Sequence, residues 1–146
     1  HLFSSAASDV YKRQISALIA ACKQMKINDL LFLVPYVSDV SEHLIEEVNS
    51  NGIKTTVTAS FDEKNEASVA RIRPTSIVDA VNELYSGQSA IFISCTNLQT
   101  FTIIEEIEKK CGCICFSSNQ VLIWQMLRLA EIDHNLRGYG KLLSKS

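Results

Sequence analysis

The sequence has few glycines, little net charge and no long apolar run. Its five glycines are scattered, so it contains neither a G-x-G-x-x-G turn nor a Walker-type phosphate loop, and we expect no nucleotide cofactor. A net charge of −2 argues against a nucleic-acid surface or a polybasic membrane patch. No apolar run reaches the roughly 18–20 residues that a membrane span needs. The 146 residues and 47% hydrophobic content instead fit one globular domain.

The cysteine pattern indicates a reduced protein. There are five cysteines, and an odd number cannot all pair within one chain. The first residues are apolar and the charges come later, which is the reverse of a secretory signal. We therefore expect a cytoplasmic protein with free thiols. Cys111, Cys113 and Cys115 have C-x-C-x-C spacing, not the C-x₂-C of zinc sites, so we favour core packing over a metal site.

Apolar runs alternate with amphipathic segments along the chain. The predicted strands are residues 29–34, 53–59, 89–94 and 113–117, and the predicted helices are 15–25, 39–50, 75–85, 96–110 and 121–131. This alternation is typical of an α/β fold: a four-stranded parallel, doubly wound (Rossmann/flavodoxin-like) sheet with helices on both faces. We expect Ser117, Ser118 and Asn119 to cap the last helix and Trp124 to lie in the core.

Cys95 is the sharpest candidate for chemistry, because ligands bind at the carboxyl ends of parallel strands. It directly follows the third predicted strand, and Thr96 and Asn97 are suitable caps for the helix expected next. The positive end of that helix would favour the thiolate, and its free N–H groups could bind a carboxylate. The alternative is a buried small hydrophobe.

Other polar residues near predicted strand ends are weaker candidates. The Tyr36 hydroxyl could donate to an anionic ligand, or the ring could pack at the rim of the sheet. Asn65 could offer amide donors, or could be a turn residue. We expect His43 to be solvated, and no histidine has a Ser or Cys partner at a recognisable spacing.

Four segments taken in order resemble a known family: VPYVSDVSEHLIEEVNSNGI, NEASVARIRP, AIFISCTNLQT and CFSSNQVLIWQMLRLA. Together they resemble the C-terminal half of the aspartate/glutamate racemase superfamily, in the maleate isomerase and arylmalonate decarboxylase branch. The resemblance extends from about Ile15 to the C-terminus, where GYGKLL also resembles the family.

The resemblance implies a cofactor-independent enzyme with two similar α/β domains around an active-site cleft. Cys95 matches the catalytic cysteine of the second domain, while Tyr36 and Asn65 match positions that bind a substrate carboxylate. We expect Thr96 and Asn97, beside Cys95, to contact the substrate as well. The implied reaction is maleate cis–trans isomerisation of a small dicarboxylic acid; amino-acid racemisation and arylmalonate decarboxylation are the alternatives within the superfamily.

The resemblance also implies a domain organisation. Residues 1–14 do not resemble the family, and SSAASDVYKRQ resembles a translated sequencing adapter, so we expect a non-native leader there. Residues 15–132 would form the second α/β domain and residues 133–146 an irregular tail. The first domain of the same chain would then be a missing partner, and we expect the fragment alone to be inactive. The sequence does not decide whether the protein forms a homo-oligomer.

Two rival hypotheses come from other classes of protein. One is a complete, non-catalytic α/β ligand-binding domain, which requires a polar outer face on every helix. The other is a metal-binding module built on the cysteine run.

Overall fold

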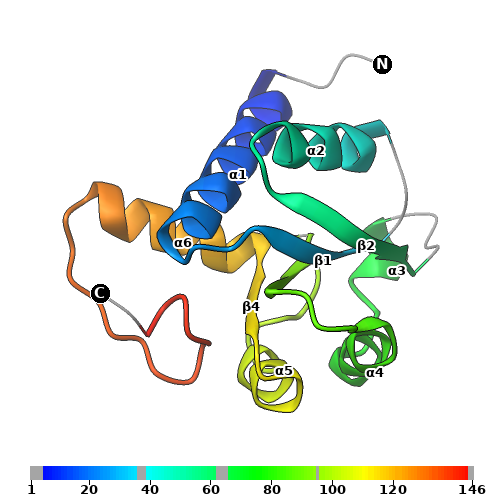
Figure 1. Cartoon of the computed structure of the whole chain (residues 1–146). Helices are drawn as coiled ribbons and strands as arrows, with labels where there is room; N and C mark the ends of the chain where they lie inside the picture. The colour runs from blue at the N-terminus through cyan, green and yellow to red at the C-terminus, as the bar shows by residue number, and fades with distance from the viewer. Residues whose placement is uncertain (1–4, 36–38, 62–65, 95, 145–146) are drawn as a thin grey trace.

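The computed structural model describes residues 5–35, 39–61, 66–94 and 96–144. Its elements are α1 (Ser5–Gln24), β1 (Asp29–Val34), α2 (Asp39–Ser50), β2 (Lys54–Ser60), α3 (Glu66–Val69), α4 (Pro74–Leu84), β3 (Ala90–Ile93), α5 (Ile104–Cys111), β4 (Ile114–Ser117) and α6 (Ser118–Leu129) (Figure 1). Across these ranges, no helix combines the length and apolarity needed to cross a membrane.

The four strands form one parallel sheet in the order β2-β1-β3-β4. Its register aligns the strand ends: Val34 pairs with Ser60, Leu33 with Ile93, and Ile93 with Ser117. The carboxyl ends of all four strands therefore meet along one edge. This confirms the predicted four-stranded parallel α/β fold.

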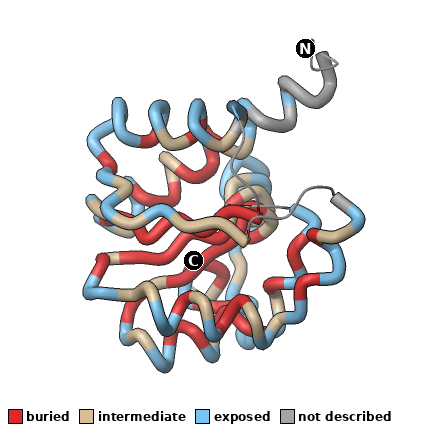
Figure 2. Tube along the Cα trace, turned by 90° about the vertical axis from the view of Figure 1, so that its right-hand side faces the viewer, coloured by how far each residue is buried: buried red, intermediate tan, exposed pale blue. Residues whose placement is uncertain are grey.

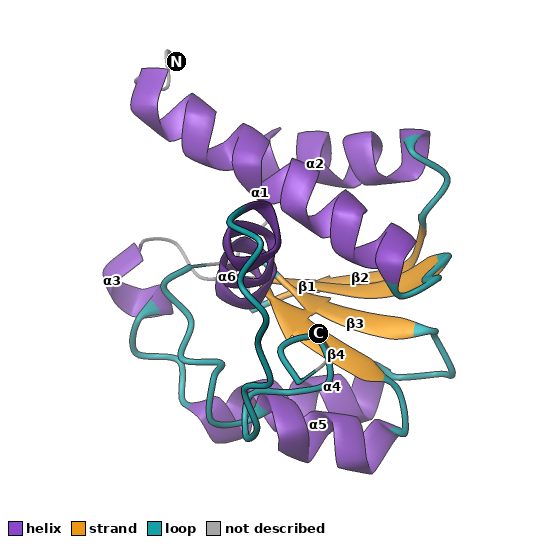
Figure 3. Ribbon diagram, turned by 90° about the vertical axis from the view of Figure 1, so that its left-hand side faces the viewer, coloured by secondary structure: helices purple, strands orange, loops and turns teal. Residues whose placement is uncertain are grey.

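Helices cover both faces of the sheet, as predicted. Helices α1, α2 and α6 lie over one face, and α4 and α5 lie over the other (Figures 1 and 3). The sheet is consequently the buried middle layer, with exposed residues gathered on the outer surfaces of the helices (Figure 2).

The central strands are apolar along their whole length because both of their faces are buried. In β1, Leu30 and Phe32 face the core under α1, α2 and α6, whereas Leu31 and Leu33 face the core under α4 and α5. Phe32 and Phe92 stack edge to face at 5.1 Å between ring centroids, and Phe116 continues the row at 5.9 Å from Phe92. The row joins three neighbouring strands across the sheet.

The C-terminal tail, residues 130–144, contains neither helix nor strand but packs closely against the domain. Leu142 and Leu143 are each 1% exposed. Gly140 lies against β4 and α5: a Cβ there would come within 2.5 Å of Ile104 Cγ2 and 3.6 Å of the Cys115 carbonyl oxygen. Its φ of +88° also favours glycine. The tail therefore covers the outer edge of β4.

One predicted helix is wrong at its start. We expected a helix over residues 96–110, but α5 begins at Ile104, and residues 96–103 form turns and irregular backbone. The segment TNLQTFT contains three threonines and an asparagine, whose side chains compete with helical backbone hydrogen bonds. Thr96 and Asn97 consequently do not cap α5; its N-cap is Ile103, which makes no side-chain cap.

Two other segments contain more helix than predicted. Helix α1 starts at Ser5 instead of Ile15, because no glycine or proline interrupts residues 5–24. The short helix α3 lies within a stretch predicted to be a polar loop. The assignment of residues 1–14 as a non-native leader stays a prediction.

Candidate active site

The candidate active site is the edge of the sheet where the four strands end. Backbone hydrogen bonds continue past the last strand residues: Phe61 N–H donates to the Val34 carbonyl at 3.2 Å, and Ser94 N–H donates to the Leu33 carbonyl at 2.8 Å. The segments that leave β2 and β3 are thereby held against β1. A parallel sheet of this kind binds ligands at this edge.

Three predicted site residues, Tyr36, Asn65 and Cys95, lie outside the described residues. Thr96 and Asn97 are described, and both are exposed in the segment that follows β3. The structure thus places two predicted contact residues on the expected edge of the sheet. Their contact with a substrate stays a prediction.

The segment after β3 is tied to the start of α6. Asn119 Nδ2 donates to the Thr96 carbonyl at 3.1 Å. This hydrogen bond connects the loop beyond Ile93 with the first turn of the helix that follows β4. It thus links a predicted site residue, Thr96, to the segment that follows the neighbouring strand β4.

The first turn of α6 is itself fixed by a capping box. The Ser117 N–H and Oγ donate to Gln120 Oε1 at 2.7 and 2.6 Å, and Gln120 N–H donates back to Ser117 Oγ at 3.4 Å. Ser117 caps this helix, as predicted. Ser118 and Asn119 were expected to cap it as well, but they lie inside its first turn, because α6 begins at Ser118 and not at the predicted residue 121. The reciprocal role of Gln120 was missed, although the S-x-x-Q spacing is the signal of such a box.

Gln120 also anchors the tail near the site. Its Nε2 donates to the Tyr139 carbonyl at 3.1 Å, and the Tyr139 ring meets Phe101 edge to face at 5.7 Å. Phe101 belongs to the segment between β3 and α5. The tail therefore reaches the same edge of the sheet as the candidate site, which sequence patterns did not indicate.

Two buried hydroxyls near this edge have no hydrogen-bond partner among the residues that the structure describes. They are Ser118 Oγ, in the first residue of α6, and Thr100 Oγ1, between β3 and α5. Both side chains are almost fully buried. Such groups carry a desolvation cost, and they distinguish this region from the fully satisfied capping box next to it.

The four described cysteines are not activated thiols. Burial raises the pKa of Cys22 to about 12 and also raises the pKa of Cys111, Cys113 and Cys115. Because the thiolate is the nucleophile, a raised pKa suppresses reactivity at neutral pH. Cys95 is the remaining cysteine of the chain.

The cysteine run packs into the core, as the sequence predicted. Cys113 is 8% exposed and Cys115 is fully buried, and both belong to the core on the α4 and α5 side of the sheet. Across residues 5–35, 39–61, 66–94 and 96–144, no three His, Cys, Asp or Glu side chains are grouped to hold a metal ion. Trp124, at 4% exposure, is also a core residue, as predicted.

A parallel α/β domain with its candidate site at the strand ends matches a class of known enzymes. The sequence profile of the arylmalonate decarboxylase family matches residues 6–143. The chain belongs to this family. The predicted superfamily and branch are therefore confirmed.

Two curated relatives carry different activities. The chain is 24% identical over 135 residues to the arylmalonate decarboxylase of Bordetella bronchiseptica, covering 90% of this chain and 56% of that protein. It is 22% identical over 130 residues to the maleate isomerase of Geobacillus stearothermophilus, covering 88% and 52%. The chain thus spans about half the length of the curated relatives it matches.

The fold is shared with solved members of the same group. The maleate isomerase Iso from Pseudomonas putida S16, in a variant crystallised with maleate, superposes with a TM-score of 0.86 at 18% identity. The match covers 91% of this chain and 54% of that one.

Proposed function

We propose that this chain is the second α/β domain of a cofactor-independent, cysteine-based isomerase that converts the cis form of a small dicarboxylic acid into the trans form. The proposal is carried by the position of Cys95, two residues beyond the end of β3 in a family whose members include a maleate isomerase. The raised pKa values of the four other thiols support it, because they leave Cys95 as the candidate nucleophile.

In the proposed reaction the Cys95 sulfur acts with a second cysteine from the other domain. One thiolate adds to a carbon of the double bond, and the electron pair of that bond moves toward the neighbouring carboxylate. The former double bond is now single and can rotate. Elimination then re-forms the double bond in the trans geometry and releases the thiolate, so the net change is isomerisation without a cofactor.

Polar groups around Cys95 would bind the substrate carboxylates. In this proposal Tyr36 and Asn65 donate to one carboxylate, and Thr96 and Asn97 contact the substrate beside the sulfur. The hydrogen bond from Asn119 to the Thr96 carbonyl holds that segment in place. Asn119 is therefore a positioning residue in this account.

Decarboxylation of an arylmalonate is the second candidate function, because the curated decarboxylase is as similar to the chain as the isomerase is. In that reaction, loss of CO₂ leaves an enediolate, and the Cys95 thiol donates the proton that completes the product. Racemisation within the same superfamily would instead use two cysteines to remove and return an α-proton. In all three reactions the Cys95 sulfur acts either as the nucleophile or as a proton donor or acceptor.

The rival hypothesis of a complete, non-catalytic binding domain fits the helices less well. It requires polar outer faces, yet Met126 and Leu129 of α6 are 69% and 71% exposed. These two side chains lie in the last turns of α6, away from the strand ends. They favour contact with further protein at that end of the helix.

The test is a substrate panel read by proton NMR, applied to the 146-residue chain and to a longer parent that contains a preceding domain. We expect the parent to convert maleate to fumarate, Cys95→Ala to abolish conversion, and the 146-residue chain to be inactive. Cys111→Ser is the control, because Cys111 is the most exposed of the described thiols, and it should retain activity. Turnover of phenylmalonate instead of maleate would favour the decarboxylase, and full activity of Cys95→Ala would refute the proposal.

A further inference from the structure

We propose that the domain has a second ligand site, for a small planar nitrogen cation such as an amidinium or guanidinium, at the edge of the sheet opposite the candidate active site. A cavity of about 510 Å³ lies there, between the C-terminal ends of α1 and α6. Residues 131–134 and Leu142 of the C-terminal tail complete its lining. Its volume falls within the roughly 300–1,000 Å³ of small-molecule sites.

The cavity combines an apolar wall with an aromatic one. Met25, Ile114 and Leu142 supply the apolar side chains, and Trp124 contributes its indole ring. Ile114 is the first residue of β4, so the cavity opens where the strands begin. It shares no lining residue with the candidate active site at the strand ends.

The Trp124 ring already has a planar cation over it. The Arg128 guanidinium carbon lies 5.2 Å from the ring centroid, and Arg128 Nε donates to Gln125 Oε1 at 3.2 Å. This arrangement is a cation–π contact. It shows the kind of group that this wall of the cavity accommodates.

Two helices end at the cavity with the same backbone motif. Ile27 N–H donates to the Cys22 carbonyl at 2.8 Å, and Ile132 N–H donates to the Leu127 carbonyl at 3.0 Å. These are the six-to-one bonds of Schellman caps. The negative ends of both helix dipoles therefore point toward one cavity, which favours a positively charged ligand.

The residues that close these caps are unusual for the conformation they adopt. Lys26 has a φ of 56° and Glu131 a φ of 55°, and they are the only described residues other than glycine with positive φ. Left-handed backbone is the usual conformation of the residue that closes a Schellman cap, a position that glycine takes most often. Both residues line the cavity.

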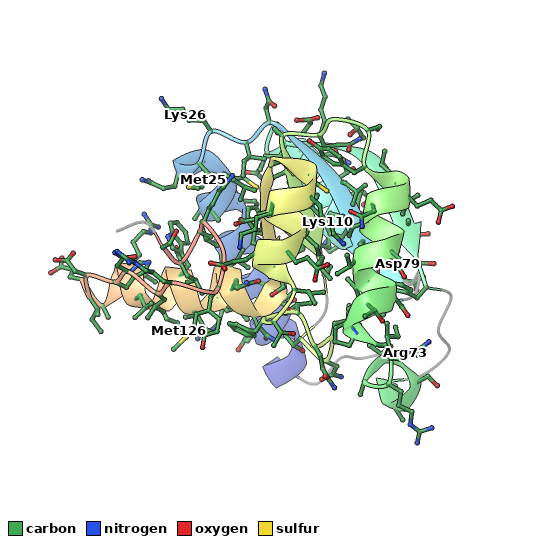
Figure 4. All side chains as sticks on the ribbon, turned by 90° about the horizontal axis from the view of Figure 1, so that it is seen from below. Met25, Lys26, Arg73, Asp79, Lys110 and Met126 are labelled. Carbon is green, nitrogen blue, oxygen red and sulfur yellow. The ribbon has the colours of Figure 1, made fainter. Side chains whose placement is uncertain are left out.

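Charged side chains at the cavity also suit a cation. Glu131 and Asp133 place two carboxylates on the wall. Of the two basic residues there, Arg128 is engaged with Trp124 and Gln125, and the Lys26 side chain projects away from the protein (Figure 4). The two carboxylates are the groups that would pair with a cationic ligand, and the Arg128 guanidinium stays charged beside them.

The test uses a matched pair of probes, benzamidine and benzoate, which share a planar aromatic shape and carry opposite charges. Trp124 is the single tryptophan of the chain, so its indole N–H gives one cross-peak in a proton–nitrogen NMR spectrum. We expect benzamidine to shift this peak saturably and benzoate to leave it unchanged. The measurement involves no turnover, so its failure would be independent of the proposed function.

Charge-neutralising variants then locate the probe. Glu131→Gln should weaken benzamidine binding by about tenfold or more, since a charge-assisted hydrogen bond is lost. Glu46→Gln on the exposed surface of α2 is the control and should bind benzamidine as the unaltered chain does. Equal shifts from benzoate, no saturable shift from benzamidine, or unchanged binding in a folded Glu131→Gln protein would each overturn the proposal.

Discussion

The Glu108 carboxylate accepts the backbone N–H of Lys141 with both of its oxygens, at 3.1 and 3.0 Å. Its Oε1 also accepts the Cys115 N–H at 3.1 Å. One side chain of α5 therefore binds both the edge strand β4 and the tail. In the first turn of the same helix, Glu105 Oε1 accepts the Gly138 N–H at 2.9 Å. Two glutamates of α5 therefore bind the tail.

Replacing Glu108 with alanine should destabilise the domain by about 3 kcal/mol, because two backbone N–H groups lose a charged acceptor. Chemical denaturation, followed by circular dichroism, measures the change. Glu106→Ala is the matched control on the same helix: its ion pair with Lys110 is half exposed, so its loss should cost far less stability than the loss of the buried Glu108 carboxylate. Equal losses in the two variants would contradict this role for Glu108.

Glu108 should also give stability a specific pH dependence. Burial raises the pKa of its carboxyl above the ordinary value of 4.5, and the N–H groups of Cys115 and Lys141 only partly oppose the shift. The folded protein then holds this proton more tightly than the unfolded chain does. The resulting stabilisation is present below pH 4.5 and is lost as the pH rises through the folded-state pKa.

Comparison with Glu108→Gln isolates this effect. The free energy of unfolding of the unaltered chain, measured relative to the variant, should fall as the pH rises from 4 to 7, a range that spans the ordinary carboxyl pKa of about 4.3–4.5. A difference that is flat or rises over this range would show that the carboxyl pKa is not raised.

Truncating the central phenylalanine should be among the most damaging core changes. Phe92 lies between Phe32 and Phe116 in the row across the sheet and is 1% exposed. Phe92→Ala removes a fully buried ring and should cost about 3–5 kcal/mol. Phe101→Ala, at a partly buried position, should cost clearly less in the same denaturation experiment.

The thiols should react in an order set by burial. Iodoacetamide at pH 8 should label Cys95 first, while Cys22 and Cys115 react only after unfolding, because burial raises the pKa of each of these two thiols. Mass spectrometry of peptides from native and denatured samples gives the order. Early labelling of Cys22 in the native protein would be inconsistent with its position in the core.

The fold could be predicted because its strongest signals are local. The run DLLFLV predicts a strand buried on both faces, and it forms β1 with the predicted bounds. The helix predicted over residues 96–110 starts too early. The helical spacing of apolar residues after Ile103 does not continue into the preceding segment TNLQTFT. There, the hydrogen-bonding capacity of threonine and asparagine outweighs the spacing.

The sequence predicts where the candidate site lies, which stays a prediction, but not the hydrogen bonds that hold the neighbouring segments. A cysteine after a buried strand predicts a site at the carboxyl edge of a parallel sheet. The roles of Glu108 and Gln120 depend on tail residues that lie 33 and 19 positions away in the sequence. On the helix alone, Glu108 looks like an ordinary solvated glutamate, and only the returning chain buries it.

The covered edge of β4 makes the two sides of the sheet unequal. Tail residues and the Glu108 carboxylate occupy the outer side of β4, whereas β2 pairs only with β1 in the described part of the chain. An additional strand, from another molecule or from elsewhere in a longer chain, could therefore extend this sheet at β2 but not at β4. The sheet can therefore be extended on the β2 side only, because residues 138–141 of the tail lie against the other side.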